Sequence, residues 1–264
     1  MRPRAAASLA HSLHLMGALA FLGCGSPSCG GDGTTKEKRA FLTDLPEAGM
    51  RVLDNGAATH ASPANDAPLV FGLHGRGDTP ESFSDMFHAY GTRARFYFPR
   101  APTPSGEGYT WFSLGPGMTD NDVAKSLDEA RDALHTRIRA IAGPRKYAVV
   151  GFSQGGFLAY AFAAKYPDEL ACAIPIAGAL PEPLRPPHPR SGATLPVVRA
   201  FHGDADSRVD VAWDRDTIAS FVAAGGDAKL VVFPGLAHRT TPEVRSDVYA
   251  ALDACLTTSD ASRR

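Results

Sequence analysis

The most constraining feature of the sequence is the stretch from Tyr147 to Pro167, which predicts a strand, a tight turn and a helix in immediate succession. The turn reads Gly-Phe-Ser-Gln-Gly and places Ser153 at its apex. A turn this sharp strains the backbone of its central residue and leaves no space for a β-carbon on the near neighbours. Gly151 and Gly155 are therefore expected to be glycine for steric reasons, and Gly156 lets the helix pack closely on the strand.

The rest of the chain alternates in the same way between apolar runs and helical patterns. Strands are predicted at 50–53, 68–73, 94–99, 146–150, 171–177, 196–201 and 228–233. Helices are predicted at 81–93, 121–142, 154–166, 212–224 and 241–256. Near-continuous apolar runs are typical of parallel strands that are covered on both faces. The alternation therefore indicates an α/β fold with a mostly parallel sheet, in which ligands bind at the carboxyl ends of the strands.

The helix predicted at 121–142 has the clearest boundaries. Apolar residues recur along it at steps of three and four, which gives one apolar stripe. Thr119 and Asp122 resemble a capping box at its start, and Gly143 with Pro144 is a stop signal at its end.

The first 23 residues differ from the rest and predict a secretion signal. Arginines precede the apolar run 15–22, which is followed by Gly-Cys. This order of charged, apolar and small residues is typical of a cleaved signal peptide. The run is shorter than the about 20 residues that a membrane-spanning helix needs. Residues 21–24, Phe-Leu-Gly-Cys, resemble a bacterial lipobox, so we expect export with Cys24 as a candidate lipid anchor. The alternative is a plain cleaved signal.

The composition of the remaining chain predicts one domain between flexible ends. Residues 24–45 are predicted to be a flexible tether, because most of them are Gly, Ser, Thr or charged. Residues 46–258 contain all the predicted strands and helices and are expected to form one folded α/β domain. Residues 259–264 are predicted to be a disordered tail.

The net charge limits the kinds of partner that this chain can have, and the cysteines bear on its redox compartment. The formal net charge of -1 gives no basic field that would indicate a nucleic-acid partner. Cys172 and Cys255 could form a disulfide in an oxidising compartment or remain two buried thiols, and their spacing does not decide between these. No pattern in the sequence indicates an oligomeric state.

Ser153 is a candidate nucleophile. The turn lifts its hydroxyl out of the sheet and places the Gln154 N–H at a helix N-terminus, where it could stabilise an oxyanion. A serine hydroxyl needs a base, and with this kind of turn the chain order is serine, acid, histidine. His238 alone follows the candidate acids, whereas His188 and His202 precede them. An exposed loop histidine is the alternative interpretation of His238.

The acid is expected on the loop after the strand 196–201. Asp204 and Asp206 both lie there, two residues apart, and spacing alone does not separate them. A second oxyanion donor is expected from the loop after an early strand. The N–H of Arg76, which stands between two glycines, is placed for this role, and the neighbouring His74 is interpreted as structural.

Four motifs occur in an order that resembles one known family. They are Leu73-His-Gly-Arg-Gly-Asp-Thr79, Gly151-Phe-Ser-Gln-Gly-Gly156, His202-Gly-Asp-Ala-Asp206 followed by Val209, and Gly235-Leu-Ala-His238. Over roughly residues 66–256 the chain resembles the phospholipase/carboxylesterase family of α/β-hydrolases, which includes the acyl-protein thioesterases. The resemblance implies an α/β-hydrolase fold with helices on both faces of the sheet. It also implies Asp206 as the acid, His238 as the base, and Arg76 and Gln154 as oxyanion donors.

One segment departs from the pattern of that family. Its members usually carry Trp-Tyr/Phe-Asp on a loop over the site, whereas this chain has Trp111-Phe112-Ser113. Trp111 and Phe112 are candidates to line the substrate pocket, with plain packing as the alternative. Because the aspartate is replaced, the acyl pocket is expected to differ from that of the thioesterases, and the resemblance does not fix the substrate.

The sequence therefore predicts a serine hydrolase that cleaves small-molecule carboxylic esters through an acyl-enzyme. Thioesters and lysophospholipids are alternative substrates. This reaction requires no metal or organic cofactor, so none is expected. Neither H-E-x-x-H nor C-x-x-C occurs, so no motif supports a zinc site. Two rival functions are a serine peptidase on the same fold and a non-catalytic surface lipoprotein. Acyl chain length and alcohol group are not predicted.

Overall fold

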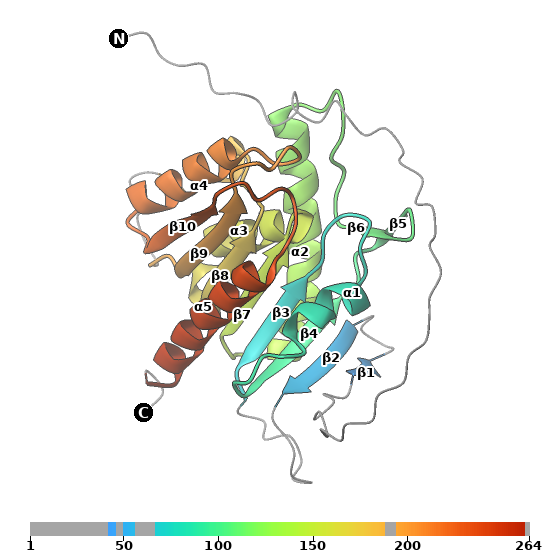
Figure 1. Cartoon of the computed structure of the whole chain (residues 1–264), viewed down its shortest axis with the longest axis vertical. Coiled ribbons are helices and arrows are strands. Elements are labelled where there is room, and N and C mark those ends of the chain that lie inside the picture. The colour runs from blue at the N-terminus through green and yellow to red at the C-terminus, as the bar shows by residue number, and fades with distance from the viewer. Residues whose placement is uncertain (1–41, 46–49, 56–66, 188–193, 262–264) are drawn as a thin grey trace.

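The computed structural model describes residues 42–45, 50–55, 67–187 and 194–261 of the chain (Figure 1). The strands of the main sheet are β1 (Leu42–Leu45), β2 (Met50–Asn55), β3 (Leu69–Leu73), β4 (Ala94–Pro99), β7 (Tyr147–Phe152), β8 (Leu170–Ile176), β9 (Val197–Gly203) and β10 (Ala228–Phe233). Within the described ranges they form one eight-stranded sheet in the order β1-β2-β4-β3-β7-β8-β9-β10. From β4 to β10 neighbouring strands are parallel, while β2 pairs antiparallel with β4, and β1 with β2.

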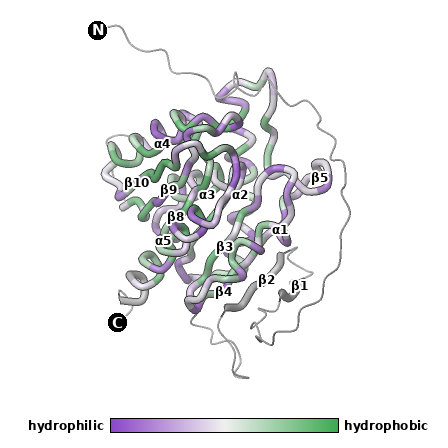
Figure 2. The backbone as a smooth tube through the Cα atoms, viewed as in Figure 1, coloured by the Kyte–Doolittle hydropathy of each residue, from purple (hydrophilic) through white to green (hydrophobic). Residues whose placement is uncertain are grey.

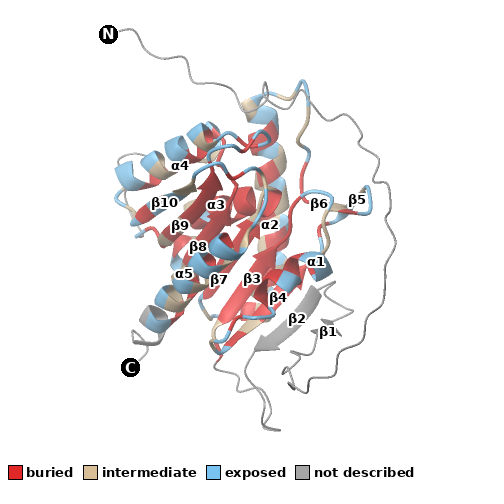
Figure 3. Ribbon diagram, in the orientation of Figure 1, coloured by how far each residue is buried: buried red, intermediate tan, exposed pale blue. Residues whose placement is uncertain are grey.

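Helices cover both faces of this sheet. They are α1 (Pro80–Ser84), α2 (Asp120–Ala142), α3 (Gln154–Lys165), α4 (Val211–Ala223) and α5 (Pro242–Ala261), with short 3₁₀ turns at Asp85–Phe87, Pro167–Glu169 and Glu182–Leu184. Because side chains alternate along a strand, Tyr147 and Val149 join the core under α2, α3 and α4, whereas Ala148 and Val150 join the core under α1 and α5. The buried strands and the inward sides of the helices are visible in Figure 3, and hydrophobic residues concentrate on the same central strands in Figure 2.

The predicted α/β fold with a mostly parallel sheet is confirmed. A strand stands at each of the predicted positions, and those at 94–99 and 228–233 have the predicted bounds. Helix α2 begins with the predicted capping box of Thr119 and Asp122, and Gly143 follows its last residue.

The helix predicted at 81–93 is wrong in its length. Helix α1 ends at Ser84, and the 3₁₀ turn that follows ends at Phe87. The chain leaves the helix so that two aromatic rings, Phe87 and Tyr90, both pack against Phe96, with centroid distances of 4.9 and 5.4 Å. Tertiary packing of these rings overrides the helical pattern of the local sequence.

Three short strands were not predicted. Besides β1, residues 102–117, which are rich in Gly and Pro, contain a small hairpin of β5 (Thr103–Ser105) and β6 (Gly108–Thr110). Strand β1 lies within residues 24–45, predicted as tether, and α5 reaches Ala261, inside the predicted tail of 259–264. The predicted signal peptide and most of the tether lie outside the described residues. Nowhere in the described part of the chain is a helix both long and apolar enough to cross a membrane.

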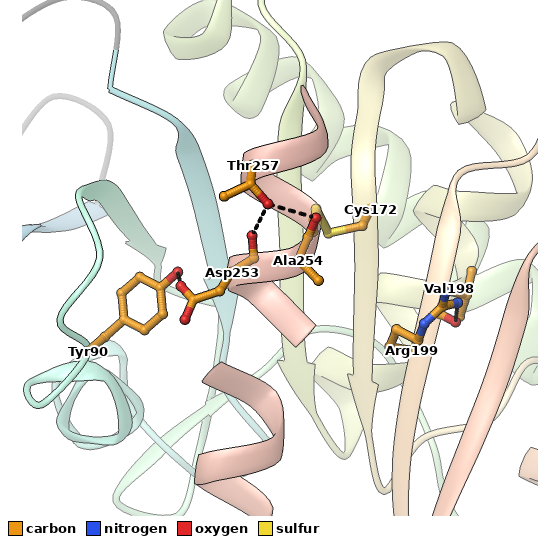
Figure 4. The surroundings of a disulfide bond; sticks show 8 residues. Tyr90, Cys172, Val198, Arg199, Asp253, Ala254 and Thr257 are labelled. Carbon is orange, nitrogen blue, oxygen red and sulfur yellow. Dashed lines mark hydrogen bonds between the residues drawn. A yellow bond between two sulfur atoms is a disulfide. The ribbon is translucent and has the colours of Figure 1, made fainter. Parts of the chain in front are cut away.

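Helix α5 is joined covalently to the sheet. Cys255 in this helix and Cys172 in β8 form a disulfide, with their α-carbons 6.2 Å apart (Figure 4). On the same helix, Asp253 accepts a hydrogen bond of 2.7 Å from the hydroxyl of Tyr90 (Figure 4). Of the two states that the sequence left open for these cysteines, the structure contains the paired one.

Candidate active site

The candidate site residues follow four strands that lie in the parallel part of the sheet. Ser153 comes directly after β7, Asp206 follows β9, and His238 follows β10. The segment 74–78, which contains Arg76, follows β3. All of them therefore lie at the carboxyl ends of the strands, where α/β folds bind their ligands.

Ser153 occupies a strained turn between β7 and α3. Its backbone angles are φ 54° and ψ -117°, a left-handed conformation that residues other than glycine rarely adopt. A β-carbon on Gly151 would lie 2.1 Å from the carbonyl oxygen of Gly155, and one on Gly155 would lie 1.9 Å from that of Leu73. One on Gly156 would lie 2.8 Å from a backbone oxygen of β8. The steric reasons expected for these glycines are therefore present in the structure.

A continuous series of hydrogen bonds joins three of the candidate residues. The Nε2 atom of His238 lies 3.0 Å from the hydroxyl oxygen of Ser153, and its Nδ1 atom lies 2.6 Å from Oδ2 of Asp206. Because an ionised carboxylate only accepts, Nδ1 carries the proton, and Nε2 is left to accept from the serine. The side chains of His238 and Asp206 are 8% and 0% exposed. This arrangement can remove a proton from the serine hydroxyl.

The structure separates the two aspartates that spacing could not. Asp206 reaches the histidine through Oδ2, and its Oδ1 accepts hydrogen bonds of 2.8 and 3.0 Å from the N–H groups of Arg208 and Val209. Asp204 instead accepts a hydrogen bond of 2.6 Å from the N–H of Gly235. Asp204 therefore holds the loop that carries the histidine, while Asp206 contacts the imidazole itself.

The surroundings of Asp206 keep its carboxylate charged. Burial acts to raise its pKa, but hydrogen bonds from His202, His238 and the Val209 N–H outweigh burial and hold the pKa well below its ordinary value. A buried carboxylate that stays ionised at neutral pH can orient an imidazole and stabilise its protonated form.

Two backbone N–H groups near the serine have no acceptor among the residues that the structure describes. The Gln154 N–H belongs to the first residue of α3, and the Arg76 N–H belongs to the loop after β3. Within the described residues, neither donates a hydrogen bond. A β-carbon on Gly75 would lie 3.5 Å from the β-carbon of Ser153, so this loop passes directly beside the serine. Both donors can therefore face an oxygen bound there.

The side chain of Gln154 has a role that the sequence did not predict. It is buried, and its Oε1 accepts from the Thr110 hydroxyl at 2.9 Å and from the Trp111 N–H at 3.0 Å. Its Nε2 donates to the carbonyl of Phe112 at 2.9 Å. These bonds fix the segment 110–112 against the first turn of α3. The one signal for this in the sequence is a glutamine at the start of a helix whose residues 155–164 are nearly all apolar.

The structure does not place Trp111 and Phe112 as open pocket walls. Their residual exposures are 4% and 5%, and both belong to the hydrophobic core. The indole N–H of Trp111 donates to the carbonyl of His74 at 2.9 Å, and the Phe112 ring lies 6.1 Å from that of Phe157. Packing, the alternative interpretation, therefore describes them better, because these partners hold both rings inside the protein. Contact with a substrate stays a prediction.

His74 is buried and takes part in backbone hydrogen bonds. Its Nε2 accepts from the Ala101 N–H at 3.2 Å, and its Nδ1 donates to the carbonyl of Gly75 at 2.7 Å. Burial lowers the pKa of His74, so the imidazole is neutral, in agreement with one donor and one acceptor nitrogen. This is the structural role expected from the sequence.

A cavity of about 510 Å³ opens beside His238. Its lining combines apolar rings such as Phe152 with charged side chains that include Asp78, Arg239 and Arg245. The Phe152 ring lies 4.9 Å from the His238 imidazole. A larger cavity, of about 930 Å³, is lined by residues near the amino ends of β7, β8 and β9 and by α5, and none of the candidate site residues lines it. The smaller cavity is therefore the candidate substrate site.

A mostly parallel sheet that carries a serine on a strained turn after a central strand, with histidine and aspartate after later strands, defines a hydrolase of the α/β class. The sequence profile of the phospholipase/carboxylesterase family matches residues 55–256. The chain belongs to this family and is a carboxylesterase-type hydrolase, so the predicted family, fold class and enzyme class are confirmed.

Individual relatives agree with this assignment. A probable carboxylesterase of Oryza sativa subsp. japonica is 29% identical over 194 residues, which cover 66% of this chain and 82% of the relative. Among solved structures, esterase PE8 is similar with a TM-score of 0.65 and 24% identity, covering 77% of this chain and 97% of that chain. The acyl-protein thioesterase 2 of Zea mays is similar with a TM-score of 0.63 and 22% identity, covering 78% and 98%. These two structures share the fold.

Proposed function

We propose that this protein is a serine esterase that hydrolyses small carboxylic esters through an acyl-enzyme on Ser153. The observation that carries the proposal is the position of His238, which lies within hydrogen-bond distance of Ser153 on one side and of Asp206 on the other. A serine without such a base is a weak nucleophile at neutral pH.

In the first half of the proposed reaction, Nε2 of His238 takes the hydroxyl proton while the Ser153 oxygen attacks the ester carbonyl. Asp206 holds the imidazole and stabilises its positive charge. The N–H groups of Arg76 and Gln154 donate to the oxygen that becomes negative, and the loss of one such donor typically raises the barrier by about 2.7–4 kcal/mol. The imidazolium then protonates the alcohol as the ester bond breaks.

In the second half, His238 takes a proton from water, and the oxygen of that water attacks the acyl-enzyme. The imidazolium returns the proton to Ser153 as the acid product leaves. The cavity beside His238, with both apolar and charged lining, supports a small ester that carries polar as well as apolar groups. Thioesters and lysophospholipids are the alternative substrates of the same chemistry.

The proposal is tested with a series of p-nitrophenyl esters of increasing acyl length, together with a thioester, a lysophospholipid and a peptide anilide. We expect turnover of at least one short ester, and labelling of the wild-type protein but not of Ser153→Ala by a fluorophosphonate probe. Turnover of the anilide alone would indicate a peptidase. Absence of both labelling and turnover would indicate a non-catalytic protein.

We also propose that the protein is exported and carries lipid on Cys24. The support is the order of charged, apolar and small residues before that cysteine. In this position the hydrolase domain would act outside the cytoplasm, at the surface of a membrane.

A further inference from the structure

A second buried pair of a histidine and an aspartate lies behind Asp206. His202, near the end of β9, places its Nδ1 atom 2.7 Å from Oδ2 of Asp214 in α4. Both side chains are 0% exposed. The hydroxyl of Tyr160 in α3 donates to the other oxygen of Asp214. The reaction described above uses none of these three groups. Burying a charged pair is unfavourable unless the two groups are well aligned and their remaining polar atoms are hydrogen-bonded.

The other nitrogen of His202 faces the candidate site. Its Nε2 atom lies 2.9 Å from the carbonyl oxygen of Val209 and 3.4 Å from Oδ2 of Asp206. A carbonyl oxygen can only accept, so this nitrogen must carry a proton. His202 therefore donates toward the loop that follows Asp206 and toward the carboxylate oxygen that contacts His238.

The surroundings of His202 favour its charged form. Burial opposes the charge, but hydrogen bonds to Asp206 and Asp214 outweigh it and raise the pKa of His202 to about 9. Among the described residues, the acidic groups that face His202 are Asp206 from its own loop and Asp214 from α4. Burial raises the pKa of Asp214, and the hydrogen bonds from His202 and Tyr160 act against this rise. Arg215 acts on Asp214 from the same helix. At neutral pH an imidazolium thus stands beside the carboxylate of Asp206.

We propose that His202 is a positioning residue for the esterase reaction, which holds the Asp206 carboxylate against His238 and is itself held by Asp214 and Tyr160. The inference rests on the proposed function of Asp206. It assigns to the His202–Asp214 pair a task beyond packing: one donor fixes the position of Asp206, and one positive charge moderates the field that Asp206 exerts on His238.

Two effects should follow when His202 changes. Without the Nε2 donor, Asp206 can move away from the histidine, and misplacement of a catalytic group by about 1 Å can lower the rate about a hundredfold. Without the positive charge, Asp206 attracts the protonated form of His238 more strongly. The acid limb of the pH–rate profile should then move to higher pH.

The two effects can be separated with a pair of variants. His202→Phe removes both the donor and the charge, whereas His202→Gln can place an amide N–H where the imidazole Nε2–H lies and removes only the charge. We expect His202→Phe to lower kcat about 10- to 100-fold with little change in KM. His202→Gln should recover most of kcat. Both should move the midpoint of the acid limb to higher pH by about half to one unit.

Thr217→Val is the matched control for a loss of stability. Thr217 lies in the same helix as Asp214, is 0% exposed, and makes hydrogen bonds with Leu180 and Trp213. This variant should lower Tm without moving the midpoint. The proposal is overturned if the Phe and Gln variants lose equal activity, or if the midpoint stays at the wild-type value. The proposal is also overturned if His202→Phe and Thr217→Val have the same Tm and His202→Phe loses no more kcat than Thr217→Val does.

Two further measurements keep the inference testable. If His202→Phe does not fold, Asp214→Asn removes a carboxylate that holds His202 in its charged form. A neutral His202 no longer offsets the charge of Asp206, so the midpoint should move in the same direction, and an unchanged midpoint would overturn the proposal. In a Ser153→Ala background, NMR titration of the His238 imidazole detects the same movement without turnover. If the wild-type protein hydrolyses no ester, the proposed function fails, while this titration still decides whether His202 acts on the Asp206–His238 pair.

Discussion

The Nε2 atom of His238 lies 3.0 Å from the hydroxyl oxygen of Ser153, although 85 residues separate them in the chain. The contact depends on the register of the sheet, because β9 and β10 pair in parallel up to Gly203 and Phe233. The loops with Asp206 and His238 begin directly after that last pair. Correct assembly of the strands therefore brings the candidate residues together.

The strained conformation of Ser153 predicts opposite effects on activity and stability. Ser153→Gly should abolish esterase activity and raise the free energy of unfolding by about 1 kcal/mol, because glycine adopts a φ of 54° without steric cost. Ser153→Ala keeps the β-carbon and should lose about a thousandfold or more in kcat/KM with little gain in stability. Ester hydrolysis and urea unfolding of both variants check this. Equal stability of the two would contradict the strain argument.

The two neighbouring aspartates predict a sharp contrast. Asp206→Asn should lower kcat about 10⁴-fold, because an amide no longer holds the correct tautomer of His238. Asp204→Asn is the matched control: its amide oxygen can still accept from Gly235, so kcat should stay near that of the wild type. Steady-state kinetics on a short p-nitrophenyl ester decide the matter, and a larger loss in the Asp204 variant would reverse the assignment of the acid.

The raised pKa of His202 predicts a loss of stability at alkaline pH. A group whose pKa is higher in the folded state contributes stability fully below its unfolded value, here 6.5, and loses that contribution as pH rises through about 9. The free energy of unfolding, measured in urea from pH 6 to 9.5, should fall over this window. His202→Gln should flatten the fall, and Thr217→Val should retain it. A wild-type curve without any fall would argue against a charged His202.

The disulfide between Cys172 and Cys255 should stabilise the folded state. It joins positions separated by 83 residues, and a cross-link over such a distance typically contributes about 2–4 kcal/mol by restricting the unfolded chain. Addition of dithiothreitol should lower the urea midpoint of the wild type. The double variant Cys172→Ala/Cys255→Ala should start from the lower value and not respond to the reductant. Identical midpoints with and without reductant would refute the effect.

The proposed lipid anchor predicts a change in partitioning. In cells that process bacterial lipoproteins, Cys24→Ser should move the protein from the membrane to the soluble fraction. Cys29→Ser provides the control, because it removes a thiol five residues further on and leaves the lipobox intact. Fractionation followed by immunoblotting measures both. Membrane association of the Cys24 variant equal to that of the wild type would exclude the anchor.

The parts of the site that are local in sequence could be predicted from it. The turn around Ser153 is specified by its own glycines, and the order of the chain selected His238. The choice between Asp204 and Asp206 could not be made from spacing. It depends on contacts with the loop after β10, where Asp204 accepts from the Gly235 N–H and Asp206 contacts His238. The family resemblance, rather than the local pattern, indicated Asp206.

Features that depend on tertiary packing could not be predicted from the sequence. Trp111 and Phe112 appear in the sequence as aromatic residues on a loop, and only the folded chain shows that Gln154 and His74 hold the segment in the core. Likewise, His202 precedes both aspartates in the chain, so the chain order excludes it as the base and predicts no other role for it. Its contact with Asp214 depends on the packing of α4 against β9, which the local sequence does not indicate.

The sulfur bridge also bears on what happens when the backbone is cut. A single proteolytic cut between β8 and β9 would place Ser153 on one peptide and His238 with Asp206 on the other. Because Cys172 and Cys255 lie on opposite sides of such a nick, the two halves would stay tethered, and only a thiol reagent would release them as separate fragments. In the described part of the chain, the disulfide would thus remain as a covalent connection between the two fragments of a cut molecule.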